Sequence, residues 1–157
     1  MKPALEDIFP LYKDRLFATA LHVCGNPDDA CDIVQETFAT YLTIGKEFQS
    51  EEHVRAWLFR VCINKAKNTA LSFWNRNTGA LEAYMEGLTF EEEEDRDLFW
   101  QVMALPGKYR TVIHLHYYED YSVDEIAKIL GITPGNVKVR LNRGRNKLRD
   151  LLGGEKS

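Results

Sequence analysis

The chain of 157 residues is 45% hydrophobic and 28% charged, which excludes wholesale disorder and leaves one folded domain or two small ones. Its formal net charge of −4 hides a change of sign: residues 1–78 carry −1, residues 79–97 carry −7 and residues 98–157 carry +4. Phosphates are contacted by a local patch, so the basic final segment matters more than the acidic total. No apolar run could span a bilayer, and three acidic residues among the first 20 argue against a signal peptide, so we expect a cytoplasmic protein.

Helical signals dominate the first half of the chain. An apolar stripe at helical spacing runs through residues 5–21 and ends at Gly25. Pro27, followed by two aspartates, opens a second helix with acids at its positive end, and Ser50, followed by two glutamates, opens a third. We therefore expect three helices before residue 78.

The second of these helices is amphipathic. At 100° per residue its apolar face consists of Ala30, Val34, Thr37, Phe38 and Tyr41. The opposite face consists of Asp32, Gln35, Glu36 and Ala39. Helical periodicity alone favours the simpler interpretation, in which this polar face is only exposed to solvent.

The third helix has a mixed face beside its apolar stripe. The stripe consists of Val54, Leu58, Val61, Cys62 and Ala66. The mixed face consists of Arg60, Asn64, Lys67 and Asn68, with Trp57 at its edge. Cations, amides and an aromatic suit single-stranded nucleic acid, in which bases stack and phosphates need neutralising. Spacing alone fits equally well with a core tryptophan beside a hydrated surface.

Residues 79–97 combine two glycines with an acidic run and separate the two helical halves. A solvated linker or frayed helix end is the simpler interpretation, and the alternative is a mimic of nucleic acid that rests in a basic channel of a partner. Strand-type alternation is nearly absent along the chain. We therefore expect an all-α fold of two small helical domains, 1–78 and 98–157, joined by this linker.

The second half predicts one helix over about 97–104 and another after Pro106. The apolar residues of the second are Val112, Ile113, Leu115 and Tyr118. Residues 122–149 then read as a helix-turn-helix, in which a small Ala127 lets the helices approach and Gly131 takes the positive-φ turn. Thr133 can cap the last helix, and Pro134 suits its first position.

Cysteine and histidine spacings do not indicate a metal site. Three cysteines, at 24, 31 and 62, lie in apolar-periodic segments, and we expect all three to be buried structural thiols. His114 and His116 are two residues apart on a predicted helix, so they point to different sides. We also find no nucleophile paired with a base and no phosphate-binding loop, so no enzyme is expected.

Three blocks of this sequence together resemble the bacterial extracytoplasmic-function (ECF) sigma factors. The first is DACDIVQETF at 29–38, and the second is WLFRV at 57–61 followed by NKAKN at 64–68. The third runs from LPGKYR at 105–110 through YSVDEIA at 121–127 to VKVRL at 137–141 and RGR at 143–145. The resemblance identifies residues 1–78 with sigma region 2 and residues 98–157 with sigma region 4. It implies a factor that binds core RNA polymerase, directs it to promoters through minus-35 and minus-10 elements, and helps to open the duplex.

The resemblance assigns surfaces to the first half. Asp32, Gln35 and Glu36 would dock on the β′ clamp helices of the polymerase. The face of Trp57, Arg60, Asn64, Lys67 and Asn68 would read the melted minus-10 element, beside a base-specificity loop at 48–51. The polymerase β flap and promoter DNA are further implied partners, and so is an anti-sigma factor. A monomer is expected when these are absent.

For the last helix, periodicity and resemblance agree. The inward residues are Val137, Leu141, Gly144, Leu148 and Leu152, and the groove-facing ones are Gly135, Asn136, Val139, Asn142 and Arg143. Lys138 and Arg140 flank that face and suit phosphates. Arg143 suits guanine, Asn142 or Asn136 could read adenine, and Val139 could touch a thymine methyl. The family usually has alanine at the position of Gly144, and glycine within a helix costs about 0.5–1 kcal/mol against alanine.

Two rival functions are less consistent with the sequence. A stand-alone helix-turn-helix regulator needs neither the acidic stripe of the second helix nor the mixed face of the third. A module that only titrates polymerase or another sigma factor does not need a basic recognition helix.

Overall fold

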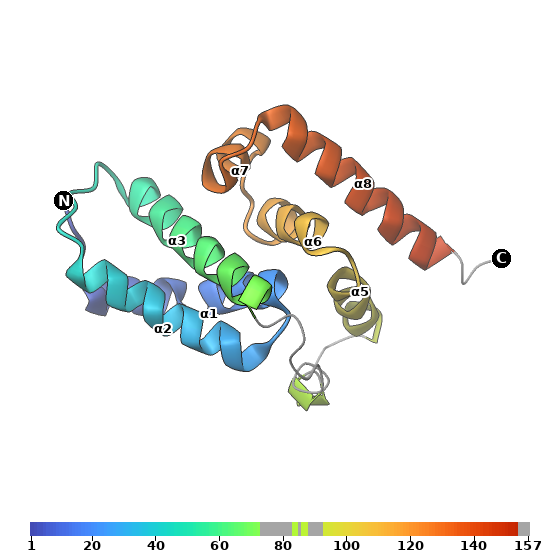
Figure 1. Cartoon of the computed structure of the whole chain (residues 1–157), viewed down its shortest axis with the longest axis horizontal. Helices are drawn as coiled ribbons and strands as arrows, with labels where there is room; N and C mark the ends of the chain where they lie inside the picture. The colour runs from blue at the N-terminus through green and yellow to red at the C-terminus, as the bar shows by residue number, and fades with distance from the viewer. Residues whose placement is uncertain (73–82, 85, 88–92, 154–157) are drawn as a thin grey trace. The chain divides into compact units, whose positions relative to one another are not determined.

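The computed structural model describes residues 1–72, 83–84, 86–87 and 93–153. Most of the expected acidic linker, 79–97, and the side chain of Leu152 lie outside the residues described. Helices make up the described structure, in which no β-strand occurs, and the chain divides into two compact units, Met1–Leu81 and Glu82–Ser157 (Figure 1). The all-α prediction is confirmed.

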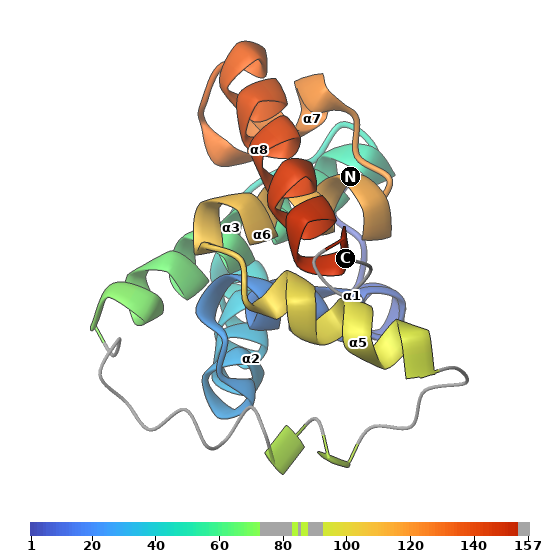
Figure 2. The same cartoon turned by 90° about the vertical axis from the view of Figure 1, so that its right-hand side faces the viewer.

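Unit 1 is built from α1 (Leu5–Cys24), α2 (Pro27–Thr43) and α3 (Glu51–Ser72), which pack against one another in every pairing (Figures 1 and 2). Gly25 ends α1 in the left-handed conformation at φ 74°, and its N–H bonds to the Leu21 carbonyl. Asn26 caps α2 by accepting from the Asp29 N–H at 3.1 Å. These two caps turn the chain within two residues, so α1 and α2 lie side by side.

The core of unit 1 follows the predicted stripes closely. All five apolar residues predicted for α2 are buried. On α3, Val61 is only half-buried, whereas Phe59 and Ile63 are fully enclosed, so the buried surface of α3 is wider than predicted. On α1, Phe9 is 43% exposed, although its ring still packs edge-on against Phe38.

Unit 2 contains α5 (Glu93–Met103), α6 (Gly107–Ile113), α7 (Val123–Leu130) and α8 (Pro134–Gly153). Helix α5 begins four residues earlier than predicted. Between α6 and α7, residues His114–Tyr118 form a π-helical turn, in which the Glu119 N–H bonds to the His114 carbonyl at 3.2 Å. This wider turn shifts the helical phase, so Tyr118 is 50% exposed and its predicted place in the apolar stripe is wrong.

The helix-turn-helix has the predicted geometry. Gly131 adopts φ 69°, and the Thr133 hydroxyl accepts from the Asn136 N–H at 3.1 Å. Ser122 and Glu125 add a reciprocal capping box at the start of α7, in which each side chain accepts from the other residue's backbone N–H. Both helices of the motif are therefore fixed at their N-terminal ends.

One prediction about the cysteines is wrong. Cys62 is fully buried and Cys24 is half-buried, but Cys31 is exposed, because it lies on the solvent side of α2 next to Asp32. Burial raises the pKa of the Cys62 thiol to about 12. His114 is buried and His116 is half-buried, as expected for residues on different sides.

Neither a metal cluster nor a transmembrane helix is found in the part of the chain that the structure describes. No three His, Cys, Asp or Glu side chains there come together as a metal ion would need. None of the helices described combines the length and apolar character needed to cross a bilayer.

Candidate nucleic-acid and polymerase interface

The polar face of α2 is open to solvent. Asp32, Gln35 and Glu36 are all exposed and lie within little more than one helical turn of each other. Their face is opposite the residues that pack on α1 and α3, so none of the three is needed for the core. Two carboxylates and an amide on one rigid, exposed surface suit a basic protein partner.

The mixed face of α3 is also a surface. Arg60, Asn64 and Asn68 are exposed and Lys67 is half-buried. Trp57 differs from these four, because its ring packs edge-on against Phe48 at 5.8 Å between centroids and lies 6.0 Å from the ring of Tyr41. The half-buried indole therefore supports the loop that precedes α3 as well as bordering the polar face.

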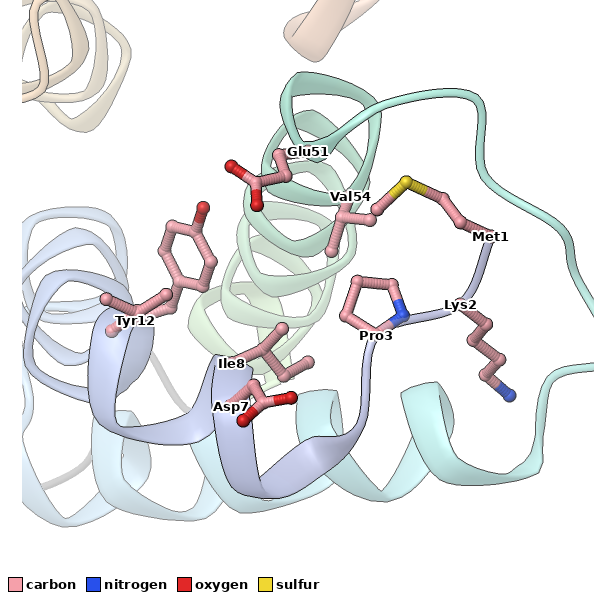
Figure 3. Close-up of a pocket in the computed structure, with 9 residues that line it drawn as sticks. Met1, Lys2, Pro3, Asp7, Ile8, Tyr12, Glu51 and Val54 are labelled. Carbon is pink, nitrogen blue, oxygen red and sulfur yellow. The ribbon is translucent and has the colours of Figure 1, made fainter.

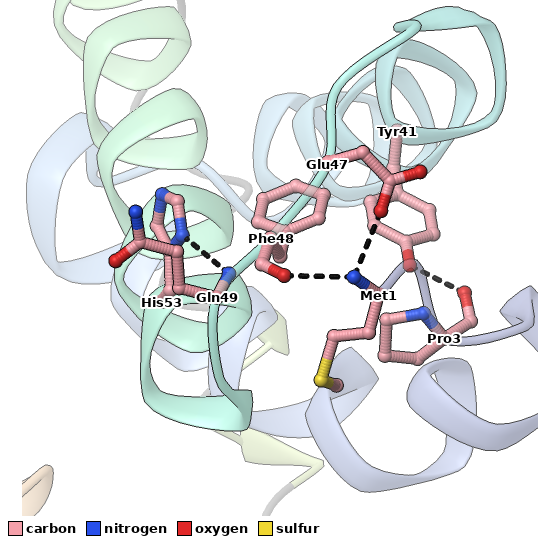
Figure 4. A network of polar contacts seen from close by, with 7 residues as sticks. All are labelled: Met1, Pro3, Tyr41, Glu47, Phe48, Gln49 and His53. Atoms are coloured by element: carbon pink, nitrogen blue, oxygen red, sulfur yellow. Dashed lines mark hydrogen bonds and ion pairs between the residues drawn. The ribbon is translucent and has the colours of Figure 1, made fainter.

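That loop, residues 44–50, is held at several points. Phe48 is 2% exposed, and its ring contacts the rings of Tyr41, His53 and Trp57. The Gln49 N–H bonds to His53 Nδ1 at 3.1 Å (Figure 4). Ser50 caps α3 by accepting from the His53 N–H. Of the loop's other side chains, those of Glu47 and Gln49 are exposed. The loop is thus fixed by the buried Phe48 ring and exposes the polar side chains of Glu47 and Gln49 to solvent.

A pocket of about 410 Å³ lies between residues 1–3 and the starts of α1 and α3 (Figure 3). Its walls combine apolar side chains, among them Ile8 and Val54, with two carboxylates, Asp7 and Glu51. Glu51 and Val54 lie on a different side of α3 from Arg60 and Asn64. The pocket is therefore separate from the mixed face.

On α8, every predicted groove-facing residue is exposed: Gly135, Asn136, Val139, Asn142 and Arg143. The flanking Lys138 is exposed and Arg140 is half-buried. Of the inward set, Val137, Leu141 and Gly144 are buried, whereas Leu148 is half-buried. A continuous polar face with one apolar side chain therefore runs along the first turns of α8.

Neighbouring side chains orient both asparagines of this face. Arg140 Nε donates to Asn136 Oδ1 at 3.2 Å, and Arg145 Nη2 donates to Asn142 Oδ1 at 2.8 Å. Arg145 also donates through Nη1 to the Tyr117 hydroxyl at 2.7 Å, which ties it to the π-helical turn. A guanidinium can only donate, so each asparagine must direct its oxygen to the arginine and its NH₂ group outward.

Arg143 lies beside Tyr109 of α6. Partial burial raises the pKa of Tyr109, but a hydrogen bond from Arg143 and the charges of Lys108, Arg143 and Lys147 outweigh it, so the pKa lies below its usual value. The side chains of Arg143 and Tyr109 are therefore close enough to interact.

Gly144 allows α6 to approach α8 closely. A Cβ at this position would lie 3.1 Å from Ile113 Cγ1 and 3.4 Å from Tyr109 Cβ. Helix α6, which leads into the π-helical turn that carries Tyr117, therefore packs against the side of α8 opposite the groove face.

Sequence reasoning missed several contributors to these surfaces. The anchoring of the 44–50 loop to residues 1 and 2 joins residues more than 40 positions apart, and periodicity carries no signal for it. Tyr117 was not singled out, because the π-helical turn that exposes it has no distinct sequence pattern. Arg145 was identified only as one of several basic residues.

These features define a class of protein: two helical units, one ending in a capped helix-turn-helix with a polar groove face, the other presenting an acidic and a mixed surface. The family models Sigma-70 region 2 and Sigma-70 region 4 match residues 8–78 and 101–148. The ECF RNA polymerase sigma factor SigW of Bacillus subtilis is 32% identical over 166 residues, which cover 95% of this chain and 89% of that protein. The RNA polymerase sigma-E factor of Streptomyces coelicolor is 31% identical over 148 residues, covering 89% and 81%. The chain therefore belongs to the ECF sigma factor family.

Solved structures that are similar to the chain include two complexes. The sigma factor RpoE in complex with the anti-sigma factor NepR, from Bartonella quintana, has a TM-score of 0.73 over 94% of this chain and 96% of that one. At 23% identity it supports the fold alone. CnrH in complex with the cytosolic domain of CnrY has a TM-score of 0.66 at 28% identity, over 95% and 87% of the two chains.

Proposed function

We propose that this protein is a sigma factor that binds core RNA polymerase, directs it to promoters through minus-35 and minus-10 elements, and helps to open the duplex. The observation that carries this proposal is the presence of both regions, in order, in one short chain. In this reading RNA synthesis belongs to the polymerase, and the protein itself is not an enzyme. Because its partners would be RNA polymerase and promoter DNA, the protein would act in the cytoplasm.

The division of labour we propose follows the two units. Residues 1–78 would act as region 2, residues 98–157 as region 4, and the acidic segment 79–97 as the linker between them. Region 2 would contact the polymerase and the minus-10 element, and region 4 the minus-35 element and the β flap of the polymerase.

The polymerase would dock on the polar face of α2. Asp32, Gln35 and Glu36 would meet basic residues of the β′ clamp helices, which speeds encounter and orients the complex. The double variant Asp32→Lys/Glu36→Lys should weaken binding to core polymerase roughly tenfold, and less at high salt.

A matched control for this docking surface is Asp14→Lys/Asp150→Lys, which changes the net charge equally at two other exposed helical positions. Binding should stay near wild-type for the control. Equal weakening by both variants would indicate a general charge effect and refute the α2 docking surface.

The minus-10 element would lie on the mixed face of α3. Arg60 and Lys67 would neutralise phosphates of the melted strand, and Asn64 and Asn68 would hydrogen-bond to base edges. Trp57 would border this surface and support the 44–50 loop. Residues 48–51, at the end of that loop and the start of α3, would add base selectivity through the exposed side chains of Gln49 and Glu51.

The minus-35 element would be read by α8 in the major groove. Lys138 and Arg140 would contact phosphates, Val139 a thymine methyl, and Arg143 a guanine. With its oxygen held by an arginine, Asn142 or Asn136 would offer NH₂ to an acceptor such as guanine O6 or thymine O4. Reading adenine uses both amide atoms, and the asparagine oxygen has a second lone pair with which it can accept from adenine N6 while the arginine stays bound.

An anti-sigma factor is the further partner we propose. The RpoE and CnrH structures described above are both of complexes, one with an anti-sigma factor and one with the cytosolic domain of CnrY. Free of partners, the chain would be a monomer.

Run-off transcription with purified core polymerase tests the function against its rivals. A promoter-dependent transcript that requires this protein supports the sigma factor. A stand-alone regulator would bind promoter DNA without core polymerase and give no transcript, and a titrating module would bind core polymerase but never direct it to a promoter.

A further inference from the structure

Residues 1–3 cross the 44–50 loop and bond to it at two separated points. Phe48 N–H donates to the Met1 carbonyl at 2.8 Å, and Lys2 Nζ donates to the Ile44 carbonyl at 2.6 Å. The Met1 ammonium donates in return to the Phe48 carbonyl at 2.9 Å and to Glu47 Oε2 at 2.8 Å (Figure 4). We call residues 1–3 the N-terminal strap.

The strap is itself fastened to the core of unit 1. The hydroxyl of Tyr41, a residue only 1% exposed, donates to the Pro3 carbonyl. Lys2 Nζ lies 5.3 Å from the centre of the Tyr41 ring, within the range of a cation–π contact. On the other side, Met1 and Pro3 form part of the pocket wall, and the Met1 side chain extends toward Val54 (Figure 3). The strap thus links the loop to α2 and to the start of α3.

Without the strap, the loop would be held mainly at its two ends, and at the first of them the Ile44 N–H bonds to the Thr40 carbonyl at 3.0 Å. Phe48 and Gln49 are held at its C-terminal end by aromatic packing and by His53. At the other end, Gly45 is exposed, with no atom within 4 Å of the place where a Cβ would stand. Lys2 reaches the carbonyl directly before this glycine. The strap therefore restrains the part of the loop that packing leaves open.

We propose that the N-terminal strap positions the 44–50 loop for base selection in the minus-10 element, although the strap need not touch DNA. This inference rests on the proposed function, in which residues 48–51, at the C-terminal end of the loop, add selectivity at the melted strand. Base-edge hydrogen bonds discriminate better when their donors and acceptors are held in place before binding. A loop that is already ordered loses less conformational entropy when the correct base binds, and it cannot rearrange to accommodate a wrong base.

The test is a pair of full-length variants compared in transcription with core polymerase. Lys2→Ala/Tyr41→Phe removes the Lys2–Ile44 and Tyr41–Pro3 hydrogen bonds while keeping the buried aromatic ring. Lys13→Ala is the matched control, because it removes another exposed lysine of the N-terminal region that does not contact the loop. Each protein is assayed on a promoter panel that substitutes every base of the minus-10 element.

For the strap variant we expect discrimination between the best and the second-best base to fall roughly two- to tenfold at one or two minus-10 positions, the effect of losing one or two ordinary hydrogen bonds. Activity with minus-35 substitutions should keep its wild-type pattern. Amide exchange at Phe48, whose N–H bonds to Met1, should become faster in the strap variant and stay unchanged in the control.

Unchanged minus-10 discrimination would overturn the proposal, whether or not exchange at Phe48 becomes faster. An equal loss of discrimination in Lys13→Ala would also overturn it, since the effect would then be one of charge. Failure of the proposed function looks different, because the wild-type protein itself would then give no promoter-dependent transcript.

Discussion

Gly144 is the position where close packing and helix propensity oppose each other. Replacing it with alanine removes the backbone freedom of a helix-interior glycine, which should stabilise unit 2 by about 1 kcal/mol. The added Cβ would lie 3.1 Å from Ile113 Cγ1 and 3.3 Å from Ile113 Cδ1, closer than the 3.5–4.0 Å of a normal carbon contact. Ile113 and Tyr109 are both buried, so they have little room to move.

Overpacking of this kind costs roughly 1–3 kcal/mol, so we expect Gly144→Ala to be destabilising by between zero and about 2 kcal/mol. Gly135→Ala is the matched control on the same helix, because its Cβ would meet only Thr133 Oγ1 at 4.0 Å. That variant should be stabilising by up to about 1 kcal/mol. The difference between the two variants isolates the cost of bringing α6 against α8.

The measurement is native-state amide exchange of α6 and α8 in the full-length chain, which gives the opening free energy of unit 2 without requiring both units to unfold together. If Gly144→Ala stabilised these amides as much as Gly135→Ala does, the close approach of α6 would not be the reason for glycine. The packing account of α8 would then be refuted.

Three further predictions concern other parts of the chain. Exposed Cys31 should react with a thiol reagent in seconds to minutes, and buried Cys62 only on unfolding. Because burial raises the pKa of the Cys62 thiol to about 12, the stability that this thiol contributes should be complete below pH 9 and lost as pH approaches 12, which alkaline unfolding would measure. Ser122→Ala should cost unit 2 about 1 kcal/mol in the same exchange experiment, because it removes the capping box. Tyr117→Phe, which frees one donor of Arg145, should change base preference only at the minus-35 position read by Asn142, whereas a uniform loss over all promoters would contradict the orienting role.

Much of the fold could be predicted because its signals are local. The faces of α2 and the groove face of α8 follow from 3.6 residues per turn, and Gly131 and Thr133 mark the turn of the helix-turn-helix by their own conformational needs. The exposure of Cys31 was missed, because an apolar residue type was taken as buried without weighing its angle on α2.

The remaining features depend on contacts that the sequence does not display. The π-helical turn inserts one extra residue into a continuous helical pattern, and only the structure shows the resulting shift of Tyr118 to the surface. Trp57 was expected either as a core residue or as part of a nucleic-acid surface, yet it packs on a loop that an N-terminal segment holds. Such long-range contacts decide how the candidate site is supported.

The most direct test of the central claim is run-off transcription by core RNA polymerase with and without this protein, on a promoter whose minus-10 and minus-35 elements are replaced in turn. We expect a transcript that needs the protein and both elements. We also expect Arg143→Ala to cost about 1–3 kcal/mol of promoter-binding free energy, and only for promoters with the preferred base at one minus-35 position. No promoter-dependent transcript on any candidate promoter would contradict the sigma factor function. A loss that is uniform across all minus-35 sequences would make Arg143 a phosphate contact.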